Sequence, residues 1–375
     1  MKPLVAVALS GGIDSLFAAY ILKEQGYKIV GIHFINGYES FSLPRKHRFH
    51  IYNDTDDVLN KKRLSNAENI VSYKITSIEK QLGIVVKVIE STIAFKKNVV
   101  DYFIQTYKSG KTPNPCLICN QSIKFGTVLD FALELGASCL ATGHYARVIK
   151  DSKGIFHLLR GSDPYKDQSY FLALLSQKQL SMVCFPLGGM TKQLAAKIAA
   201  DKGLAPVLHG ESQDICFING KTYSEFLLQQ PGFESKPGPI LDVSGNTVGR
   251  HKGLHLFTIG QRRGINCPGP EPYYVVSMDR NLNRLIVGSK KDLLAGECTV
   301  VQINWINQQP ASPLEVFTRV RYRHKAVEST LFPINRYTAV IRFKVPQSAV
   351  TPGQGAVFYL GDEVIGGGWI DCVKS

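Results

Sequence analysis

The N-terminal part of the chain contains the stretch Leu4-Val5-Ala6-Val7-Ala8-Leu9-Ser10-Gly11-Gly12-Ile13-Asp14-Ser15, in which an apolar run leads into a turn of small residues. The run predicts a buried strand, and Leu16, Ala19 and Leu22 beyond the turn predict a helix. Because glycine has no Cβ atom, backbone N–H groups in such a turn can approach an anion, and the following helix adds unpaired donors and the positive end of its dipole. Strand, glycine turn and helix in this order predict a phosphate-binding loop, the plainer alternative being a turn that binds no ligand.

The residues of this turn exclude two common phosphate-binding motifs. The turn has no Gly-Lys-Ser or Gly-Lys-Thr ending, as a Walker loop has, and no Gly-x-Gly-x-x-Gly, as a dinucleotide-binding turn has. It resembles the Ser-Gly-Gly-x-Asp-Ser signature of the PP-loop ATP pyrophosphatases. This resemblance implies that ATP is cleaved to AMP and pyrophosphate and that the AMP activates a carbonyl oxygen.

Length and charge indicate the class of protein and of partner. With 375 residues the chain is expected to form two or three domains. Its 44 Lys and Arg against 30 Asp and Glu give a net charge of +14, which favours a polyanionic partner, nucleic acid first, over a merely solvated basic surface. The sequence shows neither a signal peptide nor a membrane-spanning stretch, so we expect a cytoplasmic protein with no membrane partner and with reduced cysteines.

The first half of the sequence alternates between helical and strand patterns. Helical patterns cover 14–25 and 125–136, and strand patterns cover 28–34, 84–89 and 139–142. This alternation predicts an α/β fold with a doubly wound parallel sheet, whose ligands collect at the carboxyl ends of the strands. At one such end, Gly143 in Thr142-Gly143-His144-Tyr145 would let an adenine or ribose approach the backbone, whereas His144 is either a ligand-binding residue or a satisfied core histidine.

From about Glu211 the sequence changes to short β-like runs separated by Gly and Pro clusters. We therefore expect three domains, at 1–210, 211–288 and 289–375, of which the last two are β-rich. In the last of them, period-two alternation predicts that Phe317, Arg319, Arg321 and Arg323 share an outward face of a strand, opposite Val316, Thr318 and Val320. Such a face is either a solvated side of a half-buried sheet or a phosphate-binding surface.

A second constellation is Thr112-Pro113-Asn114-Pro115-Cys116-Leu117-Ile118-Cys119-Asn120, together with Cys216 in Ile215-Cys216-Phe217-Ile218. The prolines keep the loop extended, which predicts that Cys116 and Cys119 lie at an exposed helix entrance, where the pKa of a thiol falls and thiolate accumulates. A single Cys-x-x-Cys is ambiguous among zinc, iron–sulfur and redox uses, and no second pair completes a zinc site. The other five cysteines, Cys139, Cys184, Cys267, Cys298 and Cys372, are expected to be inert.

Six motifs occur in the order found in the bacterial tRNA-specific 2-thiouridylases, which the chain resembles nearly end to end. They are the PP-loop, Asn-Pro-x-x-x-Cys-Asn, Ala-Thr-Gly-His-Tyr, Lys-Asp-Gln, Ile-Cys-Phe-Ile and Thr-Ile-Gly-Gln-Arg-Arg-Gly. The resemblance implies an N-terminal PP-loop domain, a small central domain and a C-terminal β-barrel. It also implies conversion of the wobble uridine of Lys, Glu and Gln tRNAs to 2-thiouridine, with ATP and Mg²⁺ as cofactors and with persulfide sulfur delivered by a sulfur-relay protein or a cysteine desulfurase.

The resemblance also assigns roles to residues. The ATP site is implied at Ala8, Leu9, Ser10, Gly11, Gly12, Ile13, Asp14, Ser15, Phe34 and Gly143. Cys119 resembles the nucleophilic cysteine, and Cys216 the persulfide carrier that pairs with Cys119 in a disulfide. The target base is implied at Asn114, Pro115 and Cys116, and other tRNA contacts at His144, Lys166, Asp167, Gln168, Arg321, Tyr322 and Gln354.

The chain departs from the family pattern in two places. Many members have Asp where this chain has Cys116, so either Cys116 takes over proton transfer or Cys116, Cys119 and Cys216 hold a [4Fe–4S] cluster. The stretch 37–77, with the basic run Arg45-Lys46-His47-Arg48, also differs and has no assigned role. Three other functions stay open: a PP-loop ligase that needs no cysteines, a thiolase acting at another tRNA position, and a basic RNA-binding redox sensor, which leaves the phosphate loop unexplained.

Overall fold

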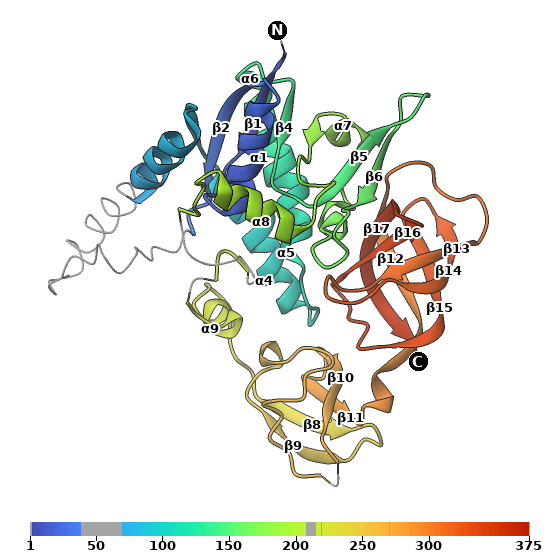
Figure 1. The fold of residues 1–375 in the computed structure, drawn as a ribbon. Helices are drawn as coiled ribbons and strands as arrows, with labels where there is room; N and C mark the ends of the chain where they lie inside the picture. The colour runs from blue at the N-terminus through green and yellow to red at the C-terminus, as the bar shows by residue number, and fades with distance from the viewer. Residues whose placement is uncertain (1, 39–69, 208–214, 219, 270, 375) are drawn as a thin grey trace, which may run out of the picture.

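The computed structural model describes residues 2–38, 70–207, 215–218, 220–269 and 271–374. Within these residues the chain forms three sheets of five, four and eight strands. Figure 1 shows three bodies, with the N-terminal sheet and its helices above, the small central body below and the C-terminal barrel to one side; two strands of the eight-stranded sheet lie in the first of these bodies. The basic run at 45–48 lies outside the described residues. In the part of the chain that the structure describes, no helix is long and apolar enough to cross a membrane.

The first sheet is fully parallel and has the strand order β3-β2-β1-β4-β7. Its strands are β1 (Leu4–Ala8), β2 (Lys28–Ile35), β3 (Val86–Glu90), β4 (Cys139–Ala141) and β7 (Val183–Cys184). Because β1 is the central strand, the glycine turn that follows it lies at the middle of the carboxyl edge of the sheet. This confirms the doubly wound parallel sheet.

Helices cover both faces of this sheet, as the alternation of side chains along β1 requires. Val5 and Val7 pack against α1 (Ile13–Glu24), the helix at 70–82 and α8 (Lys192–Asp201). Ala6 faces the other core, with side chains from α4 (Asp101–Lys108) and α6 (Val128–Glu134). Every residue of β1 except its ends is therefore buried.

The helix predicted at 125–136 starts earlier than its apolar pattern indicates. It begins as α5 (Pro115–Ile118), continues as the π-helical segment η3 (Cys119–Thr127), and ends in α6. Pro115 stands at the first helical position, where a backbone N–H group would have no acceptor within the helix, so its absence in proline costs no hydrogen bond. Two further short segments, α3 (Thr92–Phe95) and η2 (Lys96–Val100), precede α4.

A hairpin connects the N-terminal body to the barrel. Its strands are β5 (Ala146–Lys150) and β6 (Phe156–Arg160), and β6 pairs with the first residues of β17 (Glu363–Lys374). The chain then passes through η4 (Ser169–Leu172) and α7 (Gln177–Leu180) before it returns to the sheet. The eight-stranded sheet is thus shared between two bodies.

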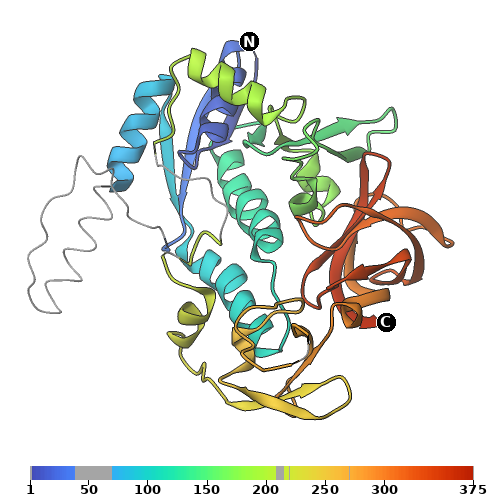
Figure 2. The same cartoon turned by 60° about the horizontal axis from the view of Figure 1, so that its bottom comes forward.

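The remaining elements form the central body and the barrel. The central body begins with α9 (Tyr223–Leu228), and its sheet has the strand order β10-β11-β8-β9. The strands are β8 (Gly238–Asp242), β9 (Thr247–His251), β10 (Tyr274–Asp279) and β11 (Arg284–Gly288). The short helix η5 (Leu254–Leu256) follows β9. After η6 (Lys291–Leu293), the barrel consists of β12 (Leu294–Trp305), β13 (Leu314–Arg319), β14 (Val327–Asn335), β15 (Thr338–Ser348), β16 (Gly355–Leu360) and β17. Pairing of β12 with β17 closes it, which confirms the C-terminal β-barrel. Figures 1 and 2 both place the central body beside the barrel and α4.

The predicted alternation holds along β13, where Val316 and Thr318 are buried and Phe317 is exposed, but the outward row of arginines does not continue it. Strand β13 ends at Arg319, so Arg321 and Arg323 lie in the turn beyond it and do not continue its alternation. Arg319 itself is mostly buried, and its Nη1 atom lies 3.1 Å from Oδ2 of the buried Asp167. The ion pair between Arg319 and Asp167, a residue of the N-terminal body, therefore keeps this side chain from facing solvent as the local alternation predicts.

Candidate active site

The glycine turn after β1 is shaped by its own backbone and hydroxyl groups. Gly11 has φ +83°, a left-handed conformation that favours glycine. The Leu9 N–H donates to the Ile32 carbonyl oxygen at 2.8 Å, and Ser15 Oγ donates to the Gly12 carbonyl oxygen at 2.8 Å. Helix α1 begins directly behind this turn, so its first N–H groups point toward the carboxyl edge of the sheet.

A second strand end meets the turn at Gly143. A Cβ atom there would lie 2.7 Å from the carbonyl carbon of Asp14 and 2.9 Å from the backbone nitrogen of Ser15. The loop after β4 therefore packs directly on the first turn of α1, which only a glycine permits. Phe34 stands near the end of β2, partly buried and in contact with the core. The structure thus brings all predicted ATP-site residues to one edge of the sheet.

The carboxylate of Asp14 is held by two residues that lie far away in sequence. Lys192 Nζ lies 2.6 Å from Oδ1 and 2.7 Å from Oδ2, and the Tyr145 hydroxyl donates to Oδ1 at 2.8 Å. No local pattern predicts either partner, since Tyr145 follows Asp14 by 131 residues and Lys192 follows it by 178. The ion pair fixes the orientation of the only carboxylate of the turn.

The barrel holds the loop that leads to the cysteines. The Thr112 N–H donates to the Pro352 carbonyl oxygen at 2.9 Å. Gln354 Nε2 donates to the carbonyl oxygens of Thr112 at 3.1 Å and Pro113 at 2.9 Å. Gln354, which was predicted to contact tRNA, therefore uses its side-chain amide within the protein. It positions the loop that contains Thr112 and Pro113.

Two tyrosine hydroxyls hold the segment that is expected at the target base. Asn114 is buried, its backbone N–H donates to the Tyr102 hydroxyl at 3.3 Å, and its Nδ2 donates to the Tyr170 hydroxyl at 3.4 Å. Pro115 is buried and Cys116 is exposed. Of the three residues, Cys116 is the one that the structure presents to solvent.

The expected exposure and lowered pKa are wrong for Cys119. Cys119 is buried rather than exposed, and burial raises the pKa of its thiol to about 12, with smaller contributions from Cys216 and Cys116. The positive charge of Lys124 opposes this shift, but it does not outweigh the desolvation, so Cys119 is a thiol at neutral pH. Cys116, by contrast, is exposed, as expected for its place at the helix entrance.

The segment of Cys216 packs beside Cys119, although 97 residues separate the two in sequence, because Phe217 and Cys119 belong to the same core cluster. Cys216 is exposed, while the next residue, Phe217, is buried against Phe95 and Phe103 with ring centroids 5.8 and 5.2 Å apart. No disulfide joins any of the eight cysteines in the structure, and the Cys119–Cys216 disulfide stays a prediction. Among the described residues, no group of three or more His, Cys, Asp or Glu side chains is placed to hold a metal ion, so the three thiols do not fit the [4Fe–4S] alternative.

Of the two alternatives for His144, the structure favours a core histidine whose hydrogen bonds are satisfied within the protein. Its side chain is buried between Phe125 and Phe185, with both ring centroids 5.9 Å away, and its Nδ1 lies 2.6 Å from the Thr142 hydroxyl. Burial, helped by the charge of Lys124, lowers the His144 pKa well below its ordinary value. A direct contact of this ring with tRNA is not available in the structure.

Four other predicted tRNA contacts have partners inside the protein. Asp167 is buried and its Oδ1 accepts from the backbone N–H groups of Gly161 and Ser169, while Gln168 Oε1 accepts from the Tyr145 N–H. Arg321 donates to the Ile259 carbonyl oxygen at 3.1 Å and to the Thr351 hydroxyl, which connects the central body to the barrel. Tyr322 packs on Phe171 with ring centroids 4.3 Å apart. Lys166 is partly exposed.

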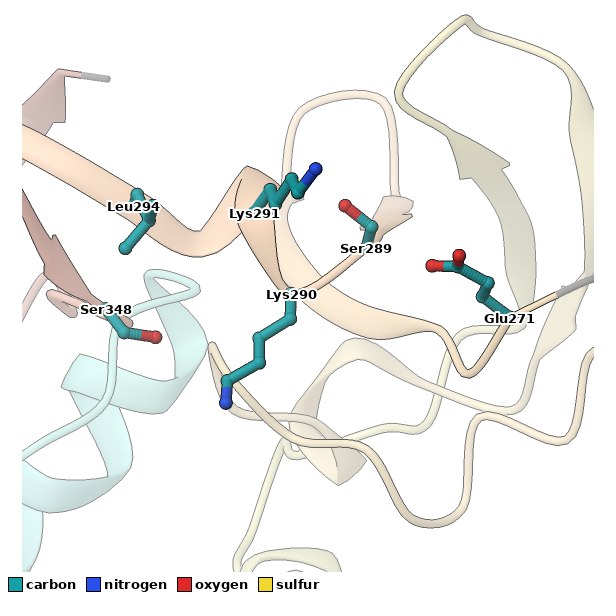
Figure 3. Close-up of a pocket in the computed structure, with 6 residues that line it drawn as sticks. All are labelled: Glu271, Ser289, Lys290, Lys291, Leu294 and Ser348. Atoms are coloured by element: carbon teal, nitrogen blue, oxygen red, sulfur yellow. The ribbon is translucent and has the colours of Figure 1, made fainter.

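A cavity of about 500 Å³ lies apart from these residues, where the central body meets the barrel. Figure 3 shows its lining: Glu271, Ser289, Lys290, Lys291, Leu294 and Ser348. It contains no cysteine and no residue of the glycine turn, so it is not the candidate active site.

The fold and the strand-end turn define a PP-loop domain of the HUP class. Residues 3–220 match the family model described as tRNA methyl transferase HUP domain, residues 224–289 match the tRNA methyl transferase PRC-barrel domain, and residues 295–370 match the aminomethyltransferase beta-barrel domain. Curated proteins named tRNA-specific 2-thiouridylase MnmA are similar over almost the whole chain. The one from Desulfosudis oleivorans is 45% identical over 98% of this chain and 95% of its own, and that from Geobacter metallireducens is 42% identical over 99% and 97%. The chain belongs to the tRNA-specific 2-thiouridylase family.

Proposed function

We propose that this chain is a tRNA sulfurtransferase that uses ATP to convert a wobble uridine to 2-thiouridine. The observation that carries the proposal is that Cys119 and the segment around Cys216 pack in one core cluster, in a chain whose central strand ends in a PP-loop. A PP-loop ligase of another kind needs no such thiols, and an RNA-binding redox sensor needs no PP-loop. The family model's description names a methyl transferase, but paired thiols are groups for sulfur chemistry, and the curated relatives are named as thiouridylases.

The nucleotide is proposed to bind across Ala8 to Ser15, with Phe34 and Gly143 beside it. Mg²⁺ is proposed to accompany the nucleotide, because it is commonly held by one or two carboxylates together with phosphate oxygens; Asp14 would bind it in exchange for its ion pair with Lys192. When bound, it would neutralise phosphate charge. Lys192 and Tyr145 keep the Asp14 carboxylate in one orientation, so the site is prepared before the nucleotide arrives.

The base is proposed to reach the segment Asn114 to Cys116 after it leaves the stack of the anticodon loop. The uracil C2 oxygen attacks the α-phosphorus of ATP, pyrophosphate leaves, and the C2 oxygen becomes part of an AMP leaving group. The net charge of +14 favours the approach of a tRNA, and Lys, Glu and Gln tRNAs are the proposed substrates.

The exposures of the two thiols suit a division of labour. Cys216 is exposed and accepts persulfide sulfur from a sulfur-relay protein or a cysteine desulfurase. The terminal sulfur attacks C2, forming a C–S bond as the C–O bond to AMP breaks. Cys119 then loses its proton and attacks the Cys216 sulfur, which breaks the S–S bond, releases 2-thiouridine and leaves a Cys119–Cys216 disulfide for an external thiol to reduce. Lys124 favours the Cys119 thiolate in this step.

The proposal is tested with purified protein, tRNA and sulfur-labelled persulfide donor. Asp14→Ala should abolish tRNA-dependent pyrophosphate release. Cys216→Ser should fail to accept labelled sulfur, whereas Cys119→Ser should accept it without delivering it to tRNA. If both Ser variants make 2-thiouridine at the parental rate, the proposed thiol pair is wrong.

A further inference from the structure

The loop at 161–168, between β6 and η4, contains a buried carboxylate that the proposed function does not use. It belongs to Asp163, which is 7% exposed. Its Oδ2 accepts from the backbone N–H of Lys192 at 2.8 Å, and its Oδ1 accepts from the backbone N–H of Tyr165 at 3.0 Å. A buried carboxylate is costly unless it is hydrogen-bonded, so these two bonds define the place of Asp163 in the fold.

The bond to Lys192 fixes the start of α8. Lys192 is the first residue of this helix, where a backbone N–H group has no acceptor within the helix. Asp163 supplies the acceptor, and its negative charge is favourable at the positive end of the helix dipole. The side chain of the same Lys192 reaches the glycine turn and contacts both oxygens of Asp14. A shift of the start of α8 would therefore move this ammonium group away from Asp14.

The same loop also holds the other partner of Asp14. Gln168 Oε1 accepts from the Tyr145 N–H at 3.0 Å, the Gln168 N–H donates to the Tyr145 carbonyl oxygen at 2.9 Å, and the Tyr145 hydroxyl donates to Asp14. On its other side the loop is attached to the barrel, through the ion pair between Asp167 and Arg319. Both groups that hold the Asp14 carboxylate thus depend on where this one loop lies.

We propose that Asp163 is a positioning residue for the use of ATP: it fixes the start of α8, and thereby holds the Lys192 ammonium group at Asp14. This inference rests on the proposed function, because it takes the nucleotide to bind at the glycine turn. The competing account makes Asp163 a helix cap that stabilises the fold and has no separate effect on the reaction.

The test measures kcat for tRNA-dependent pyrophosphate release, and the melting temperature, in the full-length protein. Asp163→Ala should lower kcat about 100-fold, the usual effect of misplacing a group in the site by about 1 Å. Asp163→Asn keeps one side-chain oxygen as an acceptor and should recover much of the rate. Thr191→Ala is the matched control, because it removes the N-cap of the same helix, where Thr191 Oγ1 accepts from the Leu194 N–H, and leaves the bond of Asp163 in place. It should lower the melting temperature and keep the parental kcat.

A double variant shows whether Asp163 acts through Lys192. Lys192→Met should lower kcat at least as much as Asp163→Ala does, and adding Asp163→Ala to it should cause no further loss. Parental kcat in Asp163→Ala, equal losses in Asp163→Ala and Thr191→Ala, or losses that multiply in the double variant would each refute the inference and leave the proposed function standing. A parent protein that releases no pyrophosphate with tRNA refutes the proposed function, and this inference with it. If Asp163→Ala does not fold, Asp163→Ser, whose single oxygen cannot accept both bonds in the same way, takes its place in the comparison.

Discussion

Substitution of Gly143 by alanine probes the contact that joins the two strand ends. The new Cβ atom would lie 2.7 Å from the Asp14 carbonyl carbon and 2.9 Å from the Asp14 carbonyl oxygen. Carbon atoms pack at about 3.5–4.0 Å, so the first turn of α1 or the loop after β4 must move by roughly 1 Å. Both neighbours are backbone and cannot rotate aside.

We expect Gly143→Ala to lower the free energy of unfolding by about 1–3 kcal/mol, the usual cost of overpacking. Its effect on tRNA-dependent pyrophosphate release should be larger, on the order of 100-fold, because a displacement of about 1 Å disturbs the alignment of reacting groups. Gly189→Ala is the matched control, since a Cβ atom there meets nothing within 4 Å. Pyrophosphate release and melting temperature are measured for both variants. Parental release in Gly143→Ala would refute the packing of the two loops around a nucleotide.

Further predictions concern three other residues. Cys116→Ser should keep most of the thiolation activity measured by mass spectrometry, and loss of all activity would show that this thiol takes part in the chemistry. Arg321→Met should lower the melting temperature, because Arg321 connects the central body to the barrel; an unchanged melting temperature with weaker tRNA binding would favour a direct contact instead. The pKa of His157 is raised, first by its hydrogen bond to Glu363, so its stabilising contribution is complete below pH 6.5 and is lost as pH rises through the higher folded value. Parent stability should therefore exceed that of His157→Gln at pH 6 and approach it at high pH, and a constant difference from pH 5 to 9 would contradict this.

The N-terminal sheet could be predicted because its signals are local. The apolar run of β1 and the glycine turn stand next to each other in sequence, and the strand predicted at 28–34 is observed at Lys28–Ile35. The environment of Cys119 could not be predicted in this way. Its position near a proline-led helix start indicated exposure, but packing of the N-terminal core buries it, and desolvation then dominates its pKa.

Polar side chains that bridge distant segments were the least predictable part of the site. Gln354 was interpreted from the family resemblance as a tRNA contact, and Arg319 from strand alternation as part of an outward face. In the structure they bond to Pro113 and Asp167, which lie more than a hundred residues earlier in the chain. A local pattern identifies a polar residue, but it does not say whether another part of the same chain will satisfy it.

The central claim, ATP-dependent sulfur transfer to a uridine, is tested most directly by the stoichiometry of one reaction. Purified protein is supplied with ATP, Mg²⁺, a persulfide donor and a tRNA that has an unmodified wobble uridine, and AMP, pyrophosphate and 2-thiouridine are quantified together by mass spectrometry. The account predicts equal amounts of the three products and none of them in Asp14→Ala. Formation of 2-thiouridine without AMP, or release of AMP with no thiolated base, would contradict it.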